Sequence, residues 1–106
     1  MKKLILTLCI ILIFAACGGT SNTSTNKYTV IYYGNGQTSG YPPVDNNQYT
    51  SGSYATVLDK NTLEKTGYKF TCWNTKQDRS GTDYASGDKI EIKNINIFLY
   101  AVWSKE

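Results

Sequence analysis

The most constraining feature of this sequence is a run of seven apolar residues near its end, from Ile97 to Trp103. Successive side chains of a strand point to opposite faces, so a strand formed here is apolar on both faces. Strands of this kind lie in the centre of a sheet and are buried on two sides. The sequence therefore predicts a sheet in which this segment is a central strand, covered on both faces.

Four further segments carry strand patterns, and Gly, Ser, Asn and Pro residues separate them; they are residues 28–33, 54–58, 67–73 and 89–92. The first segment ends before Asn35-Gly36, a dipeptide that favours turns because both residues tolerate positive φ. Helix signals are weak. Residues 44–49 and 59–65 have only turn-length patterns, and residues 74–88 predict a long surface loop. We expect a mainly β (small α+β) domain with about four to five strands and at most one short helix.

The start of the chain has the plan of a secretory signal. Lys2 and Lys3 precede an apolar run over residues 4–14, and small residues follow it. This run is shorter than the roughly 18 to 20 residues that a membrane-spanning helix needs. Residues 1–16 are therefore interpreted as a signal peptide that is removed.

Phe14-Ala15-Ala16-Cys17 resembles the bacterial lipobox, although Phe14 stands where an aliphatic residue is usual. The resemblance predicts that Cys17 is lipidated and that the membrane is a partner through this N-terminal lipid. The alternative is an ordinary signal peptide that leaves Cys17 as an unmodified thiol. The other residues of the segment 17–26 are Gly, Thr, Ser and Asn, which is typical of a flexible linker with an average span of roughly 15 to 18 Å.

The absence of histidine removes most catalytic and zinc-binding arrangements. We therefore expect no catalytic residue, no metal site and no cofactor. Without Lys2 and Lys3, nine of the 11 basic residues remain against eight acidic ones, a formal charge of +1. This balance gives no electrostatic argument for a nucleic-acid partner.

Cys72 is the one thiol of the predicted domain, because Cys9 lies in the leader and Cys17 at its end. In a regular strand, Cys72 shares a face with Tyr68 and Phe70, so we expect a buried, inert thiol. The alternatives are an intermolecular disulfide and a catalytic nucleophile, for which the chain offers no activating histidine.

Three carboxylates occur in the predicted loop, at Asp78, Asp83 and Asp88. Pairs of carboxylates can hydrolyse glycosides, but one of the two then needs a raised pKa in an apolar cleft. The neighbouring residues are Ser, Gly and Thr, so we interpret the three as solvated turn residues. The segment also lacks the alternating ligands and the distal Glu of a calcium loop.

Tyrosine is the one residue type in excess, with nine copies. Tyr28, Tyr68 and Tyr100 lie on predicted strands that need core material. Five others fall at strand ends or in loops, where aromatic rings provide contact area at a small entropic cost. These candidate binding residues are Tyr33, Tyr41, Tyr49, Tyr54 and Tyr84, and the alternative is that they cover the rim of a small core.

Four segments of this sequence match a known pattern in order and spacing: Tyr33 to Gly36, Gly67 to Thr75, Tyr84 to Asp88 and Leu99 to Trp103. In these segments the chain resembles the internalin B-repeat family, also called the Listeria/Bacteroides repeat. The resemblance covers residues 27–103. Tyr33 departs from it where the family commonly has Asp, and Cys72 where the family commonly has Gly. The resemblance implies a compact β-grasp-like module of bacterial surface proteins, associated with adhesion or partner binding and without catalytic activity. The predicted structural core is Tyr68, Phe70, Trp73, Leu99, Tyr100 and Trp103.

The sequence thus favours a lipoprotein that is anchored to the membrane of the bacterial cell envelope and exposed at the surface. Its domain is expected to act as a non-catalytic binding or adhesion module for a host or envelope protein or glycan. The alternative is a structural spacer of the envelope that has no outside ligand. A hydrolytic enzyme is the least favoured hypothesis.

Overall fold

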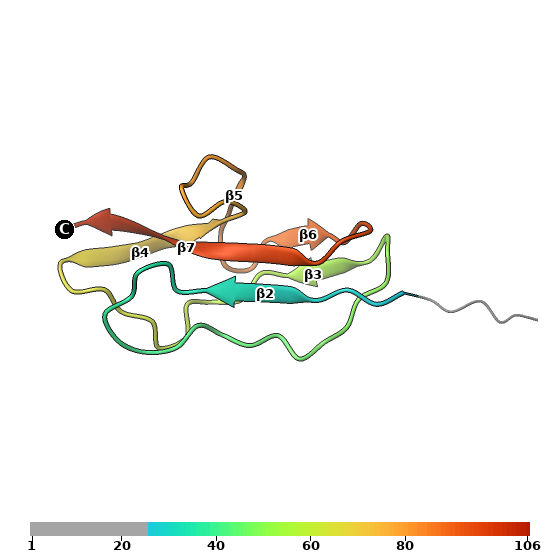
Figure 1. Ribbon diagram of the computed structural model, residues 1–106, viewed down its shortest axis with the longest axis horizontal. Coiled ribbons are helices and arrows are strands. Elements are labelled where there is room, and N and C mark those ends of the chain that lie inside the picture. Colours follow the sequence, from blue (N-terminus) through green and yellow to red (C-terminus); the bar gives the residue numbers. More distant parts are fainter. Residues whose placement is uncertain (1–25) are drawn as a thin grey trace, which may run out of the picture.

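The computed structural model of this protein describes residues 26–106, so the expected signal peptide, Cys17 and most of the expected linker lie outside the described residues. The described part is mainly β, as expected, and contains no helix (Figure 1). Its strands are β2 (Val30–Tyr33), β3 (Tyr54–Thr56), β4 (Tyr68–Asn74), β5 (Asp83–Tyr84), β6 (Lys89–Glu91) and β7 (Ile97–Lys105).

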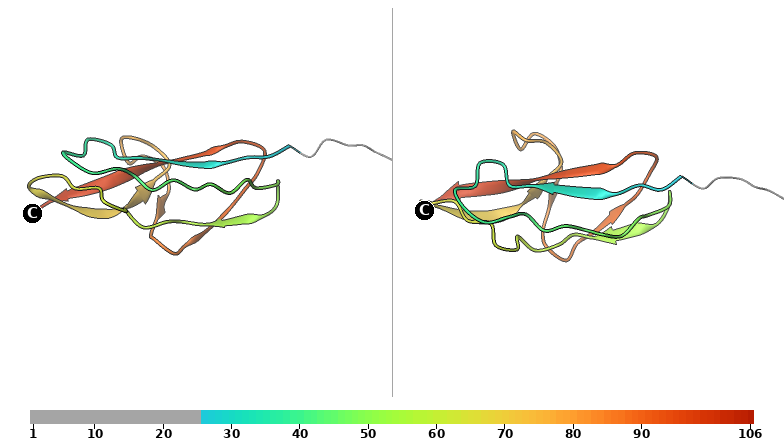
Figure 2. Two further views of the ribbon diagram at one scale, coloured as in Figure 1. Left: turned by 90° about the horizontal axis from the view of Figure 1, so that it is seen from below. Right: turned by 60° about the horizontal axis from the view of Figure 1, so that its bottom comes forward.

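Four of these strands form one sheet in the order β2-β7-β4-β5, and β3 pairs with β6 in a second sheet. β7 is parallel to β2 and antiparallel to β4. The prediction that the closing apolar run is a central strand is thus confirmed. β2 and β7 begin at the end of the molecule where the described chain starts, and the C-terminus lies at the opposite end (Figures 1 and 2).

The core lies between one face of the four-stranded sheet, called the inner face below, and the segments that cross it. Alternate residues of the strands supply this core, as the two-residue period requires. The most deeply buried side chains come from both layers; they include Tyr32, Val57, Leu63, Trp73, Ile92 and Leu99. Ala55 of β3 and Ile90 of β6 also join this cluster, so the small sheet covers part of the inner face.

Two side chains of the large sheet bind the backbone of Leu58, which follows β3. The Leu58 N–H donates to the hydroxyl of Tyr32 at 2.9 Å, and its C=O accepts the indole N–H of Trp73 at 2.8 Å. The two rings also contact each other edge to face, with 4.8 Å between centroids. Tyr32 on β2 and Trp73 on β4 thereby hold the second layer against the sheet, and we call these three residues the Leu58 clamp.

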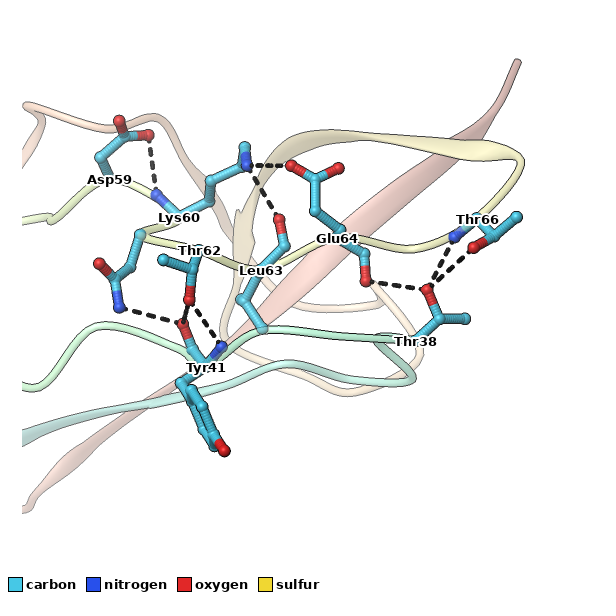
Figure 3. Close-up of polar contacts among 9 residues, drawn as sticks. Thr38, Tyr41, Asp59, Lys60, Thr62, Leu63, Glu64 and Thr66 are labelled. Atoms are coloured by element: carbon cyan, nitrogen blue, oxygen red, sulfur yellow. Dashed lines mark hydrogen bonds and ion pairs between the residues drawn. The ribbon is translucent and has the colours of Figure 1, made fainter.

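The long connections before β3 and before β4 are bonded to each other (Figure 3). Glu64 exchanges backbone hydrogen bonds with Ser39, and Thr38 binds both the carbonyl of Glu64 and the amide of Thr66. Gly40 is required at the crossing, because a Cβ there would lie 1.9 Å from the carbonyl oxygen of Thr62. These contacts seat Leu63 in the core with no exposed surface.

The turn after β2 has the predicted conformation, since Asn35 and Gly36 have φ values of 54° and 96°. The Asn35 side chain donates to the carbonyls of Gln77 and Ala101, both at 3.0 Å. Trp103 donates its indole N–H to the carbonyl of Gly34 at 2.9 Å. The turn is therefore fixed against β7 and against the loop that follows β4.

The prediction that Tyr68, Phe70 and Cys72 share a face is wrong, because β4 contains a β-bulge between Phe70 and Cys72. Phe70 lies opposite Trp103, whereas Cys72 lies opposite Val102. Adjacent residues of β7 face opposite sides, so Phe70 and Cys72 do as well. The extra residue brings Phe70 and Trp73 together on the inner face, with 5.1 Å between ring centroids.

Two details of the secondary structure differ from the sequence expectations. Neither 44–49 nor 59–65 forms a helix, because both segments are held by contacts to other strands and loops. The predicted loop over 74–88 contains the two-residue strand β5, whose Asp83 and Tyr84 pair with Asn74 and Trp73. A strand this short has too few residues to show a periodic pattern.

Candidate functional site

The face of the four-stranded sheet opposite the core carries apolar side chains. Cys72 and Val102 on this face are buried, whereas the apolar side chains along β2 and the first half of β7 are partly exposed. Ile31 lies beside Phe98 and Tyr33 beside Tyr100, in the register of β2 and β7. We call these four residues the outer strip. Ile31, Tyr33 and Phe98 are 36%, 42% and 41% exposed, and Tyr100 is half-buried. The expectation that the central strand is covered on both faces is therefore wrong at Phe98, although Val102 farther along the same face is buried, and the exposed outer strip is the candidate site.

Tyr33 is the centre of the outer strip. Its ring is stacked on that of Tyr100, at 5.1 Å and 17°, and on that of Phe98, at 6.2 Å and 24°. Rings stacked on one another use their faces for that contact, which leaves less ring face for a flat ligand such as a sugar. The strip therefore offers ring edges, two tyrosine hydroxyls and the Ile31 side chain to a partner.

The five tyrosines proposed from the sequence do not form one surface. Tyr33 belongs to the outer strip, whereas Tyr41 is 77% exposed on a loop and Tyr54 is 62% exposed on β3. Tyr49 and Tyr84 are half-buried and pack against the core. The Tyr49 hydroxyl donates to Asp45 at 2.6 Å, and burial is the main cause of its raised pKa.

The six residues proposed as the core also occupy different environments. Trp73 and Leu99 are fully buried, and Phe70 and Trp103 pack against the core cluster from its edge. Tyr68 is half-buried with the Lys65 ammonium 4.4 Å from its ring centroid. Tyr100 points away from the core and belongs to the outer strip, one position along β7 from Leu99.

Sequence reasoning missed the inner Tyr32 and the outer Ile31 and Phe98. The signal that could have found them is the two-residue period of β2 and β7 read together. Val30 and Tyr32 alternate with Ile31 and Tyr33 along β2. If the core covers one face of the sheet, one of these pairs lies in the core and the other lies on the opposite face.

The loop between β4 and β5 is organised by a buried amide. The Asn74 side chain, which has no exposed surface, accepts the N–H groups of Lys76 and Gly81 and donates to the carboxylate of Asp83 at 2.7 Å. This bond from Asn74, followed by the Arg79 side chain at 3.1 Å, lowers the pKa of Asp83. The pKa of Asp78 is also lowered, mainly by its hydrogen bonds to Ser80. Both carboxylates therefore remain ionised at neutral pH, and neither has the raised pKa of a general acid.

Asp88, the third acidic residue of this segment, accepts the backbone N–H of Ala85 at 2.8 Å. Among residues 26–106, no three His, Cys, Asp or Glu side chains lie close enough together to hold a metal ion. In the same part of the chain, no helix has the length and apolar character to cross a membrane.

Cys72 lies on the outer side of β4, opposite Val102, and only 8% of it is exposed. Burial is the main cause of the raised pKa of its thiol, and the neighbouring Asp83 carboxylate raises the pKa further. A thiol held in its protonated form is a poor nucleophile.

The family model of the Listeria-Bacteroides repeat domain matches residues 28–102. Two proteins of Evansella cellulosilytica are similar: one named "Putative Gly-rich membrane protein" is 41% identical over 80 residues, and one named "Putative membrane protein" is 37% identical over 81. Each alignment covers 76% of this chain but only 9% and 12% of the relatives, so the chain spans about a tenth of their length. No solved structure matches.

The environment of Cys72 predicts slow modification of a folded chain that begins at Lys27, in which this is the one thiol. Ellman's reagent should react much faster after addition of denaturant. Because the folded pKa is raised, the contribution of this thiol to stability is complete below about pH 8.5, the ordinary thiol pKa, and is lost as the pH rises further. Equal reaction rates in the folded and denatured chains would contradict the assignment, and Cys72→Ser is the control for the colour reaction.

Proposed function

This chain belongs to the Listeria-Bacteroides repeat family, and we propose that it is a non-catalytic binding module of the bacterial cell envelope that contacts its partner through the outer strip. The uncovered strip of Ile31, Tyr33, Phe98 and Tyr100 is the observation that carries this proposal. Apolar patches on a soluble domain are typical of interaction sites. Association with the envelope is supported by the relatives, which are named as membrane proteins.

The anchor in this proposal is a lipid on Cys17, which resembles a lipobox cysteine. Because one acyl chain gives only marginal membrane binding, stable attachment needs at least two acyl chains or one chain and a second contact. Lipidation would place the domain at the membrane surface, within the span of the segment 18–26.

The principal alternative is a spacer of the envelope that binds no further ligand. The function of a spacer does not require an exposed aromatic surface. A polar residue in place of Tyr33 would leave that function unchanged. The outer strip therefore favours the binding role. A hydrolytic role has less support, because the lowered pKa values of Asp78 and Asp83 are unsuited to a general acid.

Replacing Tyr33 should weaken binding without unfolding the domain. We expect Tyr33→Ser, in a chain that begins at Lys27, to bind envelope fragments of the source bacterium about 30-fold more weakly, since loss of a central aromatic side chain commonly costs about 2 kcal/mol of binding free energy. Phe98→Ser should have the same effect, measured by co-sedimentation with circular dichroism as the check on folding.

Tyr41→Ser is the matched control, because Tyr41 is more exposed than Tyr33 and lies outside the strip. Its binding should equal that of the wild type. Unchanged binding by a folded Tyr33→Ser chain would count against the outer strip as the binding surface, and absence of binding by the wild type would favour the spacer.

The lipid anchor has its own test. Cells that express the full chain and receive radiolabelled palmitate should label the wild type and not Cys17→Ser, because the thiol is the acceptor of the diacylglyceryl group. Equal labelling of the two chains, or no label in either, would show that the anchor is absent.

A further inference from the structure

The outer strip begins at the end of the molecule where the described chain enters the fold. The carbonyl of Thr29 accepts the N–H of Ile97 at 2.9 Å, and the Thr29 N–H donates to the side chain of Asn96 at 3.0 Å. Tyr28 pairs with Tyr49, so the chain enters the fold at this residue, beside the connection between β6 and β7 (Figures 1 and 2). A membrane anchor at Cys17 acts on this end of the domain and not on the C-terminal end.

This end carries an apolar side chain that the fold does not use. Ile95, in the connection between β6 and β7, is 68% exposed, and its neighbours Asn94 and Asn96 are polar. Ile95 and Phe98 line a groove of about 270 Å³ together with Thr75, Lys76, Asn96 and Ile97. The groove extends the apolar surface of the outer strip to the tip of the domain.

Cationic side chains lie beside this apolar tip. Lys76 lines the groove itself, and the exposed Lys27 lies two residues before Thr29. Lys93 is 3.8 Å from Glu91, so its charge is partly matched within the protein. Lys76 also lies near the Asp78 carboxylate, but neither Lys27 nor Lys76 forms an ion pair within 4 Å among the described residues. Exposed apolar groups beside such lysines match the boundary of an anionic bilayer, where acyl chains lie below phosphate groups.

The length of the linker allows this contact. The nine residues between Cys17 and Lys27 contain no apolar and no charged side chain, and a flexible chain of this length spans roughly 15 to 18 Å on average. A lipid on Cys17 would therefore hold the tip within reach of the membrane and at high effective concentration, where even a weak contact is occupied.

We propose that this end of the outer strip docks on the surface of an anionic lipid bilayer, with Ile95 and Phe98 at the acyl boundary and Lys27 and Lys76 against the phosphates. The hydroxyls of Tyr33 and Tyr100 then lie farther along β2 and β7, toward the headgroups, where tyrosine is favoured. The inference rests on the lipid anchor of the proposed function and names the bilayer as the partner of the same strip. It would add a protein contact with the bilayer to the attachment by the acyl chains.

Quenching of a tryptophan at the tip tests the docking. The lipidated full chain with Ile95→Trp is reconstituted into phosphatidylglycerol vesicles whose acyl chains carry bromine, which quenches indole fluorescence on contact. We expect the tip tryptophan to lose more than half of its emission. Trp73 and Trp103 contribute equally to all variants and are subtracted with the wild-type chain.

Tyr41→Trp is the matched control, because it places an exposed indole on the loop that binds Asn61 and Thr62, and Tyr41 is not among the residues that line the groove of Ile95 and Phe98. Its emission should persist. The double variant Lys27→Gln and Lys76→Gln in the Ile95→Trp chain, or phosphatidylcholine vesicles, should restore most of the emission.

The outcomes separate this inference from the proposed function. Equal quenching at positions 95 and 41 in a chain that floats with the vesicles overturns the docking and leaves the anchor and the binding role in place. Loss of binding to envelope fragments after their treatment with protease also overturns it, because the partner is then a protein. A wild-type chain that floats no better than Cys17→Ser overturns the anchor and the docking together.

Discussion

The fold depends on two aromatic side chains that form hydrogen bonds with the backbone N–H and C=O of a single residue, Leu58. Leu58 lies outside any strand, so its N–H and C=O have no partners in a sheet. The Tyr32 hydroxyl accepts the first and the Trp73 indole donates to the second, while both rings fill the core beneath them. Burial raises the pKa of Tyr32, so its hydroxyl stays protonated, and the Leu58 clamp joins the two layers without a helix between them.

The same strands that form the clamp also present the candidate site. On β2, Tyr32 points to the core and Tyr33 points away from it. On β7, Leu99 points to the core and Tyr100 points away from it. Since Tyr33 and Phe98 are exposed and lie outside the core cluster, changes at these two positions cost little stability. A small domain of this kind can therefore carry an apolar contact surface on one face of its sheet while the other face holds it together.

Much of the fold was predictable from the sequence, and the particular errors have physical causes. The closing run identified the central strand, and Asn35-Gly36 identified the turn, because both signals are local. The face on which Cys72 lies was not predictable from alternation, because a bulge changes the two-residue period. Two large apolar residues three positions apart, Phe70 and Trp73, would lie on opposite faces of a regular strand, and this odd spacing is the one local sign of the bulge. The exposure of Tyr100 depends on what covers the sheet, and no pattern within one strand contains that information.

Hydroxyl removal at two adjacent tyrosines tests the division between the two faces most directly. In urea unfolding, we expect Tyr32→Phe to lower the free energy of unfolding by about 1 to 3 kcal/mol, because the Leu58 N–H loses its partner. Tyr33→Phe removes the same atom from the same strand on the outer face and should leave the free energy of unfolding unchanged. Equal losses for the two variants, or a loss at Tyr33 alone, would contradict the account in which the inner face stabilises the fold and the outer strip is free to bind.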